Sequence, residues 1–402
     1  MKDFKKVLIV AENFYPEEFR INDLVLELKN KGFKITVITQ KPTYPHAKLF
    51  PEYENKWFNK SEYEGITIYR VKAITNYNKS LFKKLLKYFT FAFLGSIVGL
   101  FIGRKYEHVF SFQVGSLICA IPATIVSRVY NIPSTIWTQD VWPDTVYAYG
   151  FKKTKLNQKL LDGFIKYIYH SFTNVVVSGP GFIKKLQPYA RQEQEIQYLP
   201  NWAEETEKFI EKFQFSDTKK IQFTFAGNIG KLQNLENVIQ AFGSMLYTYK
   251  DKAQLNIIGD GSNFEYLKKL AKSNNYTNIV FWGRQPSSQM PMYFEASDFL
   301  IISLSDKPIL SLVIPLKFQS YLVAKKPIFG VLNGEVANMI KEYNLGYCTH
   351  PDNLKEIIEG FHNCIDTTPK MREQFIKNSE ILLNKSFSRD KIINKFAIML
   401  AS

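Results

Sequence analysis

Short apolar runs alternate with amphipathic stretches along the whole chain. Near the start, 7–11 is a continuous apolar run, 18–31 carries apolar residues at helical spacing, and 33–39 is a second apolar run. These patterns predict a strand, a helix and a strand, which together form one βαβ unit. Further strand-like runs are 109–112, 134–137 and 174–177. The first half is therefore expected to be a doubly wound parallel sheet.

The same rhythm restarts in the second half. Residues 221–226 and 254–258 read as strands with a helix at 235–247 between them. Later strand-like runs are 279–282, 299–302 and 327–331. We expect an α/β protein of two Rossmann-like domains with a linker near 198–220. The expected ranges are 1–200, 201–385, and a terminal helix at 386–402 that crosses back to the first domain.

Length and composition agree with two folded domains. The chain has 402 residues, of which 46% are hydrophobic, enough for each domain to bury its own core. Subtracting 37 acidic from 52 basic residues leaves a net charge of +15, which favours an anionic partner such as nucleic acid, a membrane surface or a phosphorylated ligand. Three cysteines without CxxC spacing suggest neither a disulfide framework nor a zinc site, and they fit a reducing cytoplasm.

One segment, Tyr88 to Gly103, has sixteen residues without a charge. Basic residues flank it: Lys83, Lys84, Lys87, Arg104 and Lys105. It is shorter than the ~20 apolar residues of a spanning helix. A buried core helix, a helix in the membrane interface with its basic flanks on anionic headgroups, and a true span all stay open.

The turn after the first strand lacks the signature of a dinucleotide site. Residues 13–20 contain no glycine, whereas a GxGxxG turn is needed for the backbone to approach a pyrophosphate. The sequence thus argues against NAD binding. The turn can be purely structural, or it can contribute to a ligand site because it follows the carboxyl end of a strand.

Glycine turns follow three expected strands of the second half. Gly227 and Gly230 precede Lys231, Gly259 and Gly261 follow the next strand, and Gly283 with Arg284 follows a third. Glycine permits close backbone approach, and helix N-termini with a lysine attract an anion. Carboxyl ends of parallel strands share one edge, so these turns together indicate a site for a nucleotide diphosphate.

Two further stretches carry candidate chemistry. Residues 137–144 place Asp140 between Trp137 and Trp142 after an apolar strand, which suits a site that holds a sugar ring but also suits a salt-bridged loop. Residues 314–328 form a turn, a helix and a strand, and by themselves read as a capped amphipathic helix.

Taken in order, these stretches resemble the retaining glycosyltransferases of family 4, which have the GT-B fold of two Rossmann-like domains facing across a cleft. The resemblance covers essentially the whole chain. It is carried by Tyr15-Pro16-Glu17, 140–144, 227–233, Gly259-Asp260-Gly261 and 314–322. The branch it looks most like builds bacterial O-antigen, capsule or lipid-linked glycans and is similar to N-acetylfucosamine-type amino-sugar transferases.

The resemblance implies roles for individual residues. It places Asp140 at the reacting sugar and Lys231 at the phosphate or glycosidic oxygen, as catalytic residues. The implied donor-binding residues are Gly227, Asn228, Gln233, Gly259, Gly261, Gly283, Arg284, Pro315, Lys317, Gln319 and Ser320. The implied acceptor-binding residues are Tyr15, Glu17, Arg20 and Trp142.

The sequence departs from the family pattern in its charged residues. Asn228 and Gln233 stand where many members have arginine and lysine, and Ser311 and Gln319 stand where many have two glutamates. A neutral glutamine can bind ribose hydroxyls but supplies no charge. The phosphate charge is then expected to fall on Lys231, Lys317 and helix N-termini. With no Asp-x-Asp motif, no metal and no cofactor are expected.

The family resemblance also gives the basic surplus and the apolar segment one explanation. The implied donor is a nucleotide diphosphate sugar, usually a UDP-sugar, here with an N-acetylated amino sugar, and the implied acceptor is a polyprenyl-linked glycan. We expect a peripheral enzyme on the inner face of the cytoplasmic membrane, bound to anionic lipid through Tyr88 to Gly103 and the flanking Lys and Arg. A nucleic-acid partner is not expected. A UDP-sugar epimerase of the same fold and a non-catalytic nucleotide-sugar-binding module are the alternatives.

Overall fold

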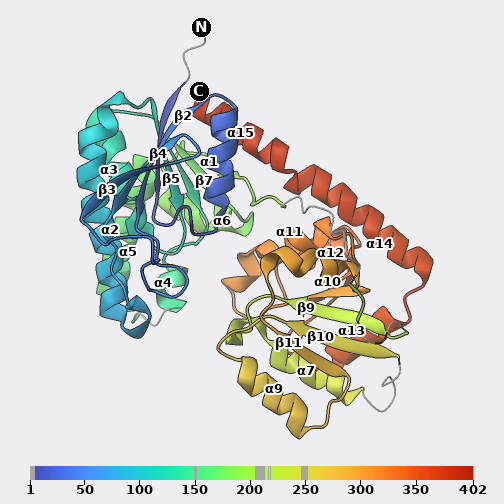
Figure 1. Cartoon of the computed structure of the whole chain (residues 1–402). Coiled ribbons are helices and arrows are strands. Elements are labelled where there is room, and N and C mark those ends of the chain that lie inside the picture. The colour runs from blue at the N-terminus through green and yellow to red at the C-terminus, as the bar shows by residue number, and fades with distance from the viewer. Residues whose placement is uncertain are drawn as a thin grey trace. The chain divides into compact units, whose positions relative to one another are not determined.

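The structure is a computed structural model that describes residues 5–148, 152–203, 213–215, 217, 219–245 and 252–401. The chain divides into two compact units (Figure 1). The first unit comprises Met1–Leu199 and Asp390–Ser402, and the second comprises Pro200–Arg389. We expected a division after residue 200 and a terminal helix at 386–402. Residues 204–212, 216 and 218 of the linker expected at 198–220 lie outside the described residues.

The first unit is built on an eight-stranded sheet of order β3-β4-β2-β1-β5-β6-β7-β8. Its neighbouring strands pair in parallel, except that β3 is antiparallel to β4. Strands β1, β5 and β6 are buried almost along their whole length, as expected where helices cover both faces of a parallel sheet. The strands are β1 (Lys6–Ala11), β2 (Lys34–Gln40), β3 (Phe58–Tyr63), β4 (Ile66–Val71), β5 (His108–Gln113), β6 (Ser134–Thr138), β7 (Asn174–Val177) and β8 (Ile196–Tyr198).

Helices cover both faces of this sheet. Ile38 of β2 lies against α2, whereas Phe110 and Trp137, which point to the opposite face by register, contact Phe396 of α15. Figure 1 shows α2, α3 and α5 grouped on one face of the sheet. The helices are α1 (Arg20–Asn30), η1 (Tyr77–Lys79), α2 (Leu81–Ile102), η2 (Gly103–Lys105), η3 (Leu117–Ala120), α3 (Ile121–Tyr130), α4 (Asp144–Ala148), α5 (Lys155–Ser171), α6 (Gly181–Leu186), η4 (Gln187–Tyr189) and α15 (Arg389–Ala401).

The second unit contains a six-stranded parallel sheet of order β11-β10-β9-β12-β13-β14. Numbered from its own first strand this is 3-2-1-4-5-6, the Rossmann order, in which ligands bind where the order reverses, between the carboxyl ends of β9 and β12. The strands are β9 (Ile221–Ala226), β10 (Ala253–Ile258), β11 (Ile279–Gly283), β12 (Phe299–Ser303), β13 (Ile328–Val331) and β14 (Gly346–Thr349).

Two helices of the second unit begin at capping residues that the sequence shows directly. Asn353 caps α13 and Thr368 caps α14, where Pro369 occupies the first helical position. The helices are η5 (Lys231–Gln233), α7 (Leu235–Ser244), α9 (Phe264–Ser273), η6 (Ser287–Gln289), α10 (Met290–Glu295), η7 (Leu310–Leu312), α11 (Leu316–Val323), α12 (Glu335–Glu342), α13 (Leu354–Ile365), α14 (Pro369–Leu382) and the π-helix η8 (Leu383–Phe387). The last residues of the helix expected at 235–247 lie outside the described part of the chain.

The two α/β units with parallel sheets confirm the predicted fold class, and the structure adds strands that the apolar runs did not reveal. The hairpin β3–β4 was not predicted because β3 is mostly exposed and reads as Phe-Asn-Lys-Ser-Glu-Tyr. It makes the edge of the first sheet antiparallel, where a purely parallel sheet was expected. Strands β8 and β14 are short and half-buried, so they also lack a continuous apolar run.

Helix α2 contains the apolar segment and has two different apolar faces. Gly95, Gly99 and Gly103 recur every four residues and face Pro122, Val126 and Tyr130 of α3. The opposite face, which we call the α2 stripe, is exposed: Phe82, Leu86, Phe89, Phe93, Leu100 and Phe101. The segment Leu81–Lys105 is long and apolar enough to cross a membrane by length and composition, and 44% of its apolar window is buried in the unit. The glycine face of α2 packs in the core of the first unit. The α2 stripe on the other side exposes apolar side chains to solvent.

Gly99→Ala is expected to destabilise the protein. A Cβ atom there would lie 2.5 Å from Cγ2 of Val126. The overpacking cost of about 1–3 kcal/mol exceeds the gain in helix propensity of about 1 kcal/mol. Gly163→Ala on α5 is the matched control, because an added Cβ atom there meets no described residue of another segment within 4 Å, and it should stabilise the protein. Urea unfolding of both variants measures the difference, and equal midpoints would contradict the packing of α2 on α3.

Candidate functional site

Three glycine corners lie side by side at the carboxyl edge of the second sheet. The Gly227 N–H donates to Ile258 O at 3.0 Å, and the Gly259 N–H donates to Gly283 O at 2.8 Å. A Cβ atom on Gly259 would lie 1.9 Å from the carbonyl oxygen of Gly227, and one on Gly261 would lie 2.5 Å from that of Ile229. Only glycine permits this close approach of the loops. The structure thus brings together the turns after β9, β10 and β11.

The side-chain nitrogen of Lys317 is buried at this edge, although the residue as a whole is half-buried. It stands in the first turn of α11, and its Nζ atom has no hydrogen-bond partner among the described residues. A Cβ atom on Gly227 would lie 3.1 Å from this nitrogen, which also lies 3.9 Å from the ring centroid of Phe225. Desolvation lowers the pKa of Lys317 to about 7. Burying an ammonium group without a counter-charge costs free energy, and a bound anion would remove much of that cost. The position of this nitrogen therefore favours binding of an anion.

Three residues near the switch point were not singled out from the sequence. The hydroxyl of Tyr321 accepts from Ala226 N at 3.4 Å and donates to Ile301 O at 3.1 Å, which links α11 to β9 and β12. The hydroxyls of Ser303 and Ser305 are buried without a partner among the described residues. Their position directly after an apolar strand was the signal that could have identified them.

The loop between Gly227 and Asn234 is ordered by its own side chains. Oε1 of Gln233 accepts from the Gly230 N–H at 3.0 Å and lies 3.5 Å from Nδ2 of Asn228. Gln233 is therefore partly engaged within the loop. Asn228 and Lys231 are exposed at the same edge and reachable by a ligand.

The remaining expected donor residues divide into accessible and inaccessible ones. Arg284 is exposed next to Gly283, and Pro315 and Ser320 are partly exposed at α11. Gln319 is fully buried, and its amide nitrogen donates to Pro315 O at 2.7 Å and to Leu316 O at 3.0 Å. Contrary to the expectation that it lines the diphosphate and ribose, Gln319 here closes the first turn of its own helix.

Asp140 lies at the carboxyl edge of the first sheet. Its Oδ2 accepts from the Gly115 N–H at 2.6 Å, and Trp142 Nε1 donates to Gly115 O at 3.0 Å. The loop after β5 thus holds both residues. Burial raises the pKa of Asp140, and the hydrogen bond from Gly115 partly offsets that shift. Trp142 also forms part of the wall of a pocket in this unit.

The expected acceptor residues near the start of the chain are only partly accessible. Tyr15 is 38% exposed and stacks on Tyr63 with ring centroids 3.6 Å apart. Glu17 is 2% exposed, and its carboxylate accepts from Asn13 Nδ2 and from the backbone N–H groups of Thr43 and Tyr44. In place of the expected acceptor contact, Glu17 ties together the loops after β1 and β2. Arg20 begins α1 and is partly exposed.

The described residues contain no group of three or more His, Cys, Asp or Glu side chains that could hold a metal ion. Cys119, Cys348 and Cys364 are free thiols. The expectation of a metal-independent and cofactor-independent enzyme stays a prediction.

Comparison with known proteins agrees with this geometry. Residues 206–381 match the family described as Glycosyl transferases group 1. The chain is 23% identical over 413 residues to the Escherichia coli K12 protein named "Putative colanic acid biosynthesis glycosyl transferase WcaI", covering 97% of this chain and 99% of that protein.

Two solved structures share the fold over almost the whole chain. Sucrose-phosphate synthase from Thermosynechococcus elongatus has a TM-score of 0.72 at 12% identity, with 99% of this chain and 98% of that chain covered. The Anabaena protein HepE in complex with UDP has a TM-score of 0.65 at 11% identity, with coverage of 99% and 100%.

The fold and the family match define the class of protein. The chain has the two-domain GT-B architecture of these glycosyltransferase structures. Residues 206–381, most of the second unit, match the glycosyl transferases group 1, and this match together with the relative WcaI supports a glycosyltransferase.

Proposed function

We propose that the protein transfers a sugar, with retention of configuration, from a nucleotide diphosphate sugar to a lipid-linked glycan in bacterial surface polysaccharide synthesis. The observation that carries the donor assignment is the Nζ atom of Lys317, which lies beside Gly227 where the strand order reverses and has no hydrogen-bond partner in the described part of the chain. The UDP in the related HepE structure and the colanic acid role in the name of WcaI support UDP and a surface polysaccharide. We assign an N-acetylated amino sugar as the group transferred.

The second unit's contribution is to stabilise the leaving diphosphate. As the glycosidic bond breaks, negative charge develops on the phosphate oxygen, and fixed cations and backbone N–H groups are the groups that stabilise it. Lys317 supplies a cation that needs no rearrangement, and Lys231 adds an exposed one. In this proposal the acceptor hydroxyl attacks from the same face and passes its proton to the departing phosphate. The family resemblance assigns Asp140 of the first unit to the reacting sugar, where a carboxylate stabilises the positive charge that develops on the ring.

The donor assignment predicts which nucleotides stabilise the fold. UDP and UDP-sugars should raise the melting temperature, because a ligand that binds only the folded state shifts unfolding upward. UMP and uridine should give much smaller shifts, since they lack the second phosphate. Differential scanning fluorimetry with UDP-sugars that carry N-acetylated and plain hexoses tests both the diphosphate and the sugar. Equal shifts with uridine and UDP would contradict a site built for a diphosphate.

Transfer must also be distinguished from epimerisation and from binding without turnover. Release of UDP that depends on an added lipid-linked acceptor supports transfer. Interconversion of UDP-sugars without an acceptor would identify an epimerase, and stabilisation by UDP-sugar without turnover would identify a binding module.

We also propose that the first unit lies on the inner face of the cytoplasmic membrane. The α2 stripe leaves Phe82, Phe93 and Phe101 between 67% and 85% exposed, and on α5 Leu156 and Leu160 are about equally exposed. A surface helix of a globular protein normally turns polar residues to solvent. Exposed lysines accompany both helices: Lys83, Lys105, Lys152, Lys153, Lys155 and Lys159. At an anionic membrane, exposed apolar side chains insert near the headgroups and neighbouring cations contact the anionic headgroups. This surface has both kinds of side chain.

The triple variant Phe82→Ser, Phe93→Ser and Phe101→Ser is expected to lose vesicle binding. Each side chain is exposed, so the fold should survive while most of the apolar area for insertion is removed. Flotation with vesicles containing phosphatidylglycerol measures binding. A matched triple change of exposed residues in the second unit, Tyr266→Ser, Leu316→Ser and Leu354→Ser, should float like the wild type. Unchanged flotation of the α2 variant would refute this membrane surface.

A further inference from the structure

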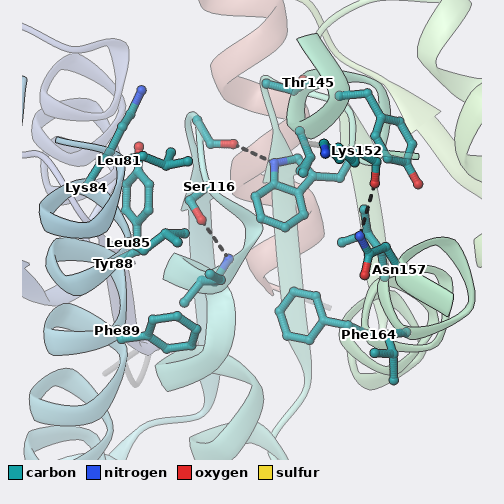
Figure 2. Close-up of a pocket in the computed structure, with 17 residues that line it drawn as sticks. Leu81, Lys84, Leu85, Tyr88, Phe89, Ser116, Thr145, Lys152, Asn157 and Phe164 are labelled. Carbon is teal, nitrogen blue, oxygen red and sulfur yellow. Dashed lines mark hydrogen bonds between the residues drawn. The ribbon is translucent and has the colours of Figure 1, made fainter. Parts of the chain in front are cut away.

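The first unit contains a pocket of about 440 Å³ beside the exposed face of α2. Figure 2 shows Leu85, Tyr88 and Phe89 projecting from α2 on one side, with Phe164 of α5 on the other. Trp142 forms another part of the wall, and its ring centroid lies 6.3 Å from that of Phe164. The volume falls within the range of small-molecule sites, about 300–1,000 Å³.

The polar groups of the wall are mostly satisfied within the wall itself. Trp142 Nε1 donates to Gly115 O, and Thr145 Oγ1 donates to Val141 O at 2.7 Å. Ser116 Oγ accepts from Ile118 N, and Asn157 Nδ2 donates to Lys152 O. Among buried side-chain atoms of the wall, the hydroxyl of Tyr147 has no partner in the described residues. A ligand in this pocket therefore meets apolar carbon and few free hydrogen-bonding groups, which excludes a sugar or a nucleotide as its main occupant.

The pocket is continuous with the apolar surface around it. Phe89 belongs both to the wall and to the α2 stripe, and Leu160 belongs both to the wall and to the exposed side of α5. The charged side chains among the lining residues are Lys84 and Lys152, both cationic. An occupant with a long apolar part and an anionic group matches this combination.

The pocket also reaches the expected catalytic edge of the first sheet. Gly115 lines the pocket, and its N–H group is the hydrogen-bond donor to Asp140. Only Gly115 would thus separate one end of an occupant from the carboxylate of Asp140, which is assigned to the reacting sugar.

We propose that this pocket binds the hydrocarbon chain of the lipid that carries the acceptor glycan, at the segment next to its phosphate. The chain enters from the membrane along α2 and α5, its phosphate lies near Lys84 and Lys152, and the attached glycan continues toward Asp140. This assignment rests on the proposed function, and it adds a chain-binding site that makes the enzyme selective for lipid-linked acceptors.

The test measures chain binding separately from donor binding. Farnesyl phosphate is titrated into the full-length protein by calorimetry below its aggregation concentration, and dimethylallyl phosphate has the same headgroup on a much shorter chain. Leu161→Trp fills the pocket from α5, and Leu85→Trp fills it from α2. Val129→Trp is the matched control, because Val129 is 58% exposed on α3, does not line the pocket and lies outside the proposed membrane surface. The UDP-induced rise in melting temperature is recorded for each variant.

The proposal predicts that farnesyl phosphate binds and dimethylallyl phosphate binds far more weakly. Each filling variant should weaken farnesyl phosphate at least about tenfold, the effect of displacing two methylene groups. Val129→Trp should stay within about twofold of the wild type, as expected for an exposed site. Unchanged farnesyl phosphate affinity in both filling variants, or equal affinity for the two phosphates, would overturn it.

Further outcomes distinguish this proposal from a site for bulk lipid and from failure of the proposed function. If palmitoyl lysophosphatidylglycerol binds as tightly as farnesyl phosphate, the pocket holds a chain of the bulk membrane, and the acceptor assignment is wrong. If UDP stabilises every variant while farnesyl phosphate does not bind, only the pocket proposal fails. If UDP does not stabilise the wild type, the proposed function itself fails.

Discussion

Lys317→Met should weaken UDP binding by about 10- to 150-fold without lowering the stability of the free protein. The lost contact is a hydrogen bond between charged groups, worth about 1.5–3 kcal/mol. The free protein loses a buried amine that has no hydrogen-bond partner among the residues that the structure describes, and a methionine side chain can still pack on the ring of Phe225. Because the folded pKa of Lys317 is about 7, below that of the unfolded chain, the unfolded state holds this proton more tightly. Stability of the wild type therefore rises with pH from about 7 toward the unfolded pKa, and the Met variant lacks that rise.

Calorimetric titration with UDP and thermal melts of the free variant give the two results. Lys355→Met, at an exposed position on α13, is the matched control and should change neither. A Met variant that binds UDP like the wild type would remove Lys317 from the donor site. A Met variant with a lower melting temperature and normal UDP affinity would give the lysine a purely structural role.

Asp140→Asn should lower kcat by about 100- to 1,000-fold with little change in KM for the donor. Asparagine keeps an oxygen that can accept from the Gly115 N–H, so the loop after β5 should hold its position. What disappears is the negative charge that stabilises the transition state, and removal of one such group typically costs this much. Because burial raises the pKa of Asp140, wild-type activity should fall on acidification above the pH at which an ordinary aspartate is protonated.

Steady-state kinetics with a lipid-linked acceptor measure this effect. Asp144→Asn is the control, since it removes an ion pair with Lys185 of 3.1 Å in the same loop region and should leave kcat within about twofold. A kcat of Asp140→Asn equal to that of the wild type would exclude the carboxylate from the reaction.

The sequence predicted those parts of the fold that depend on continuous apolar runs. Strands such as β1, β5, β9 and β12 are buried on both faces, so their apolar letters stand out without an alignment. The glycine turns were predictable as a group for the same reason, since parallel strands end at one edge. The hairpin β3–β4 was not predictable, because its stability comes from pairing at the edge of the sheet and β3 has few buried side chains.

Individual site residues were less predictable than the site as a whole. Glu17 and Gln319 occupy expected positions, but their polar atoms are engaged with the backbone around them. Conversely, the sequence could not predict that Lys317 is a central residue of the proposed donor site. The burial of its nitrogen and its distance from Gly227 depend on packing between α11 and β9. A residue type and its spacing do not reveal whether its polar atoms are already paired.

Helix α2 shows a related limit. The charge-free segment left a core helix, an interfacial helix and a span open. The structure assigns the glycine face to packing on α3 and leaves a phenylalanine-rich stripe exposed. A helix that is apolar on both sides has a low amphipathic contrast, so periodicity alone could not separate its two faces.

The most direct test of the donor site is the number of protons taken up when UDP binds at pH 8. It is obtained from calorimetric titrations in buffers of different ionisation enthalpy. With a pKa of about 7 in the free protein, Lys317 is mostly neutral at pH 8, and a diphosphate beside it should draw a proton back. We predict uptake of close to one proton by the wild type and none by Lys317→Met. UDP binding without proton uptake, or the same uptake in both proteins, would contradict a diphosphate site centred on Lys317.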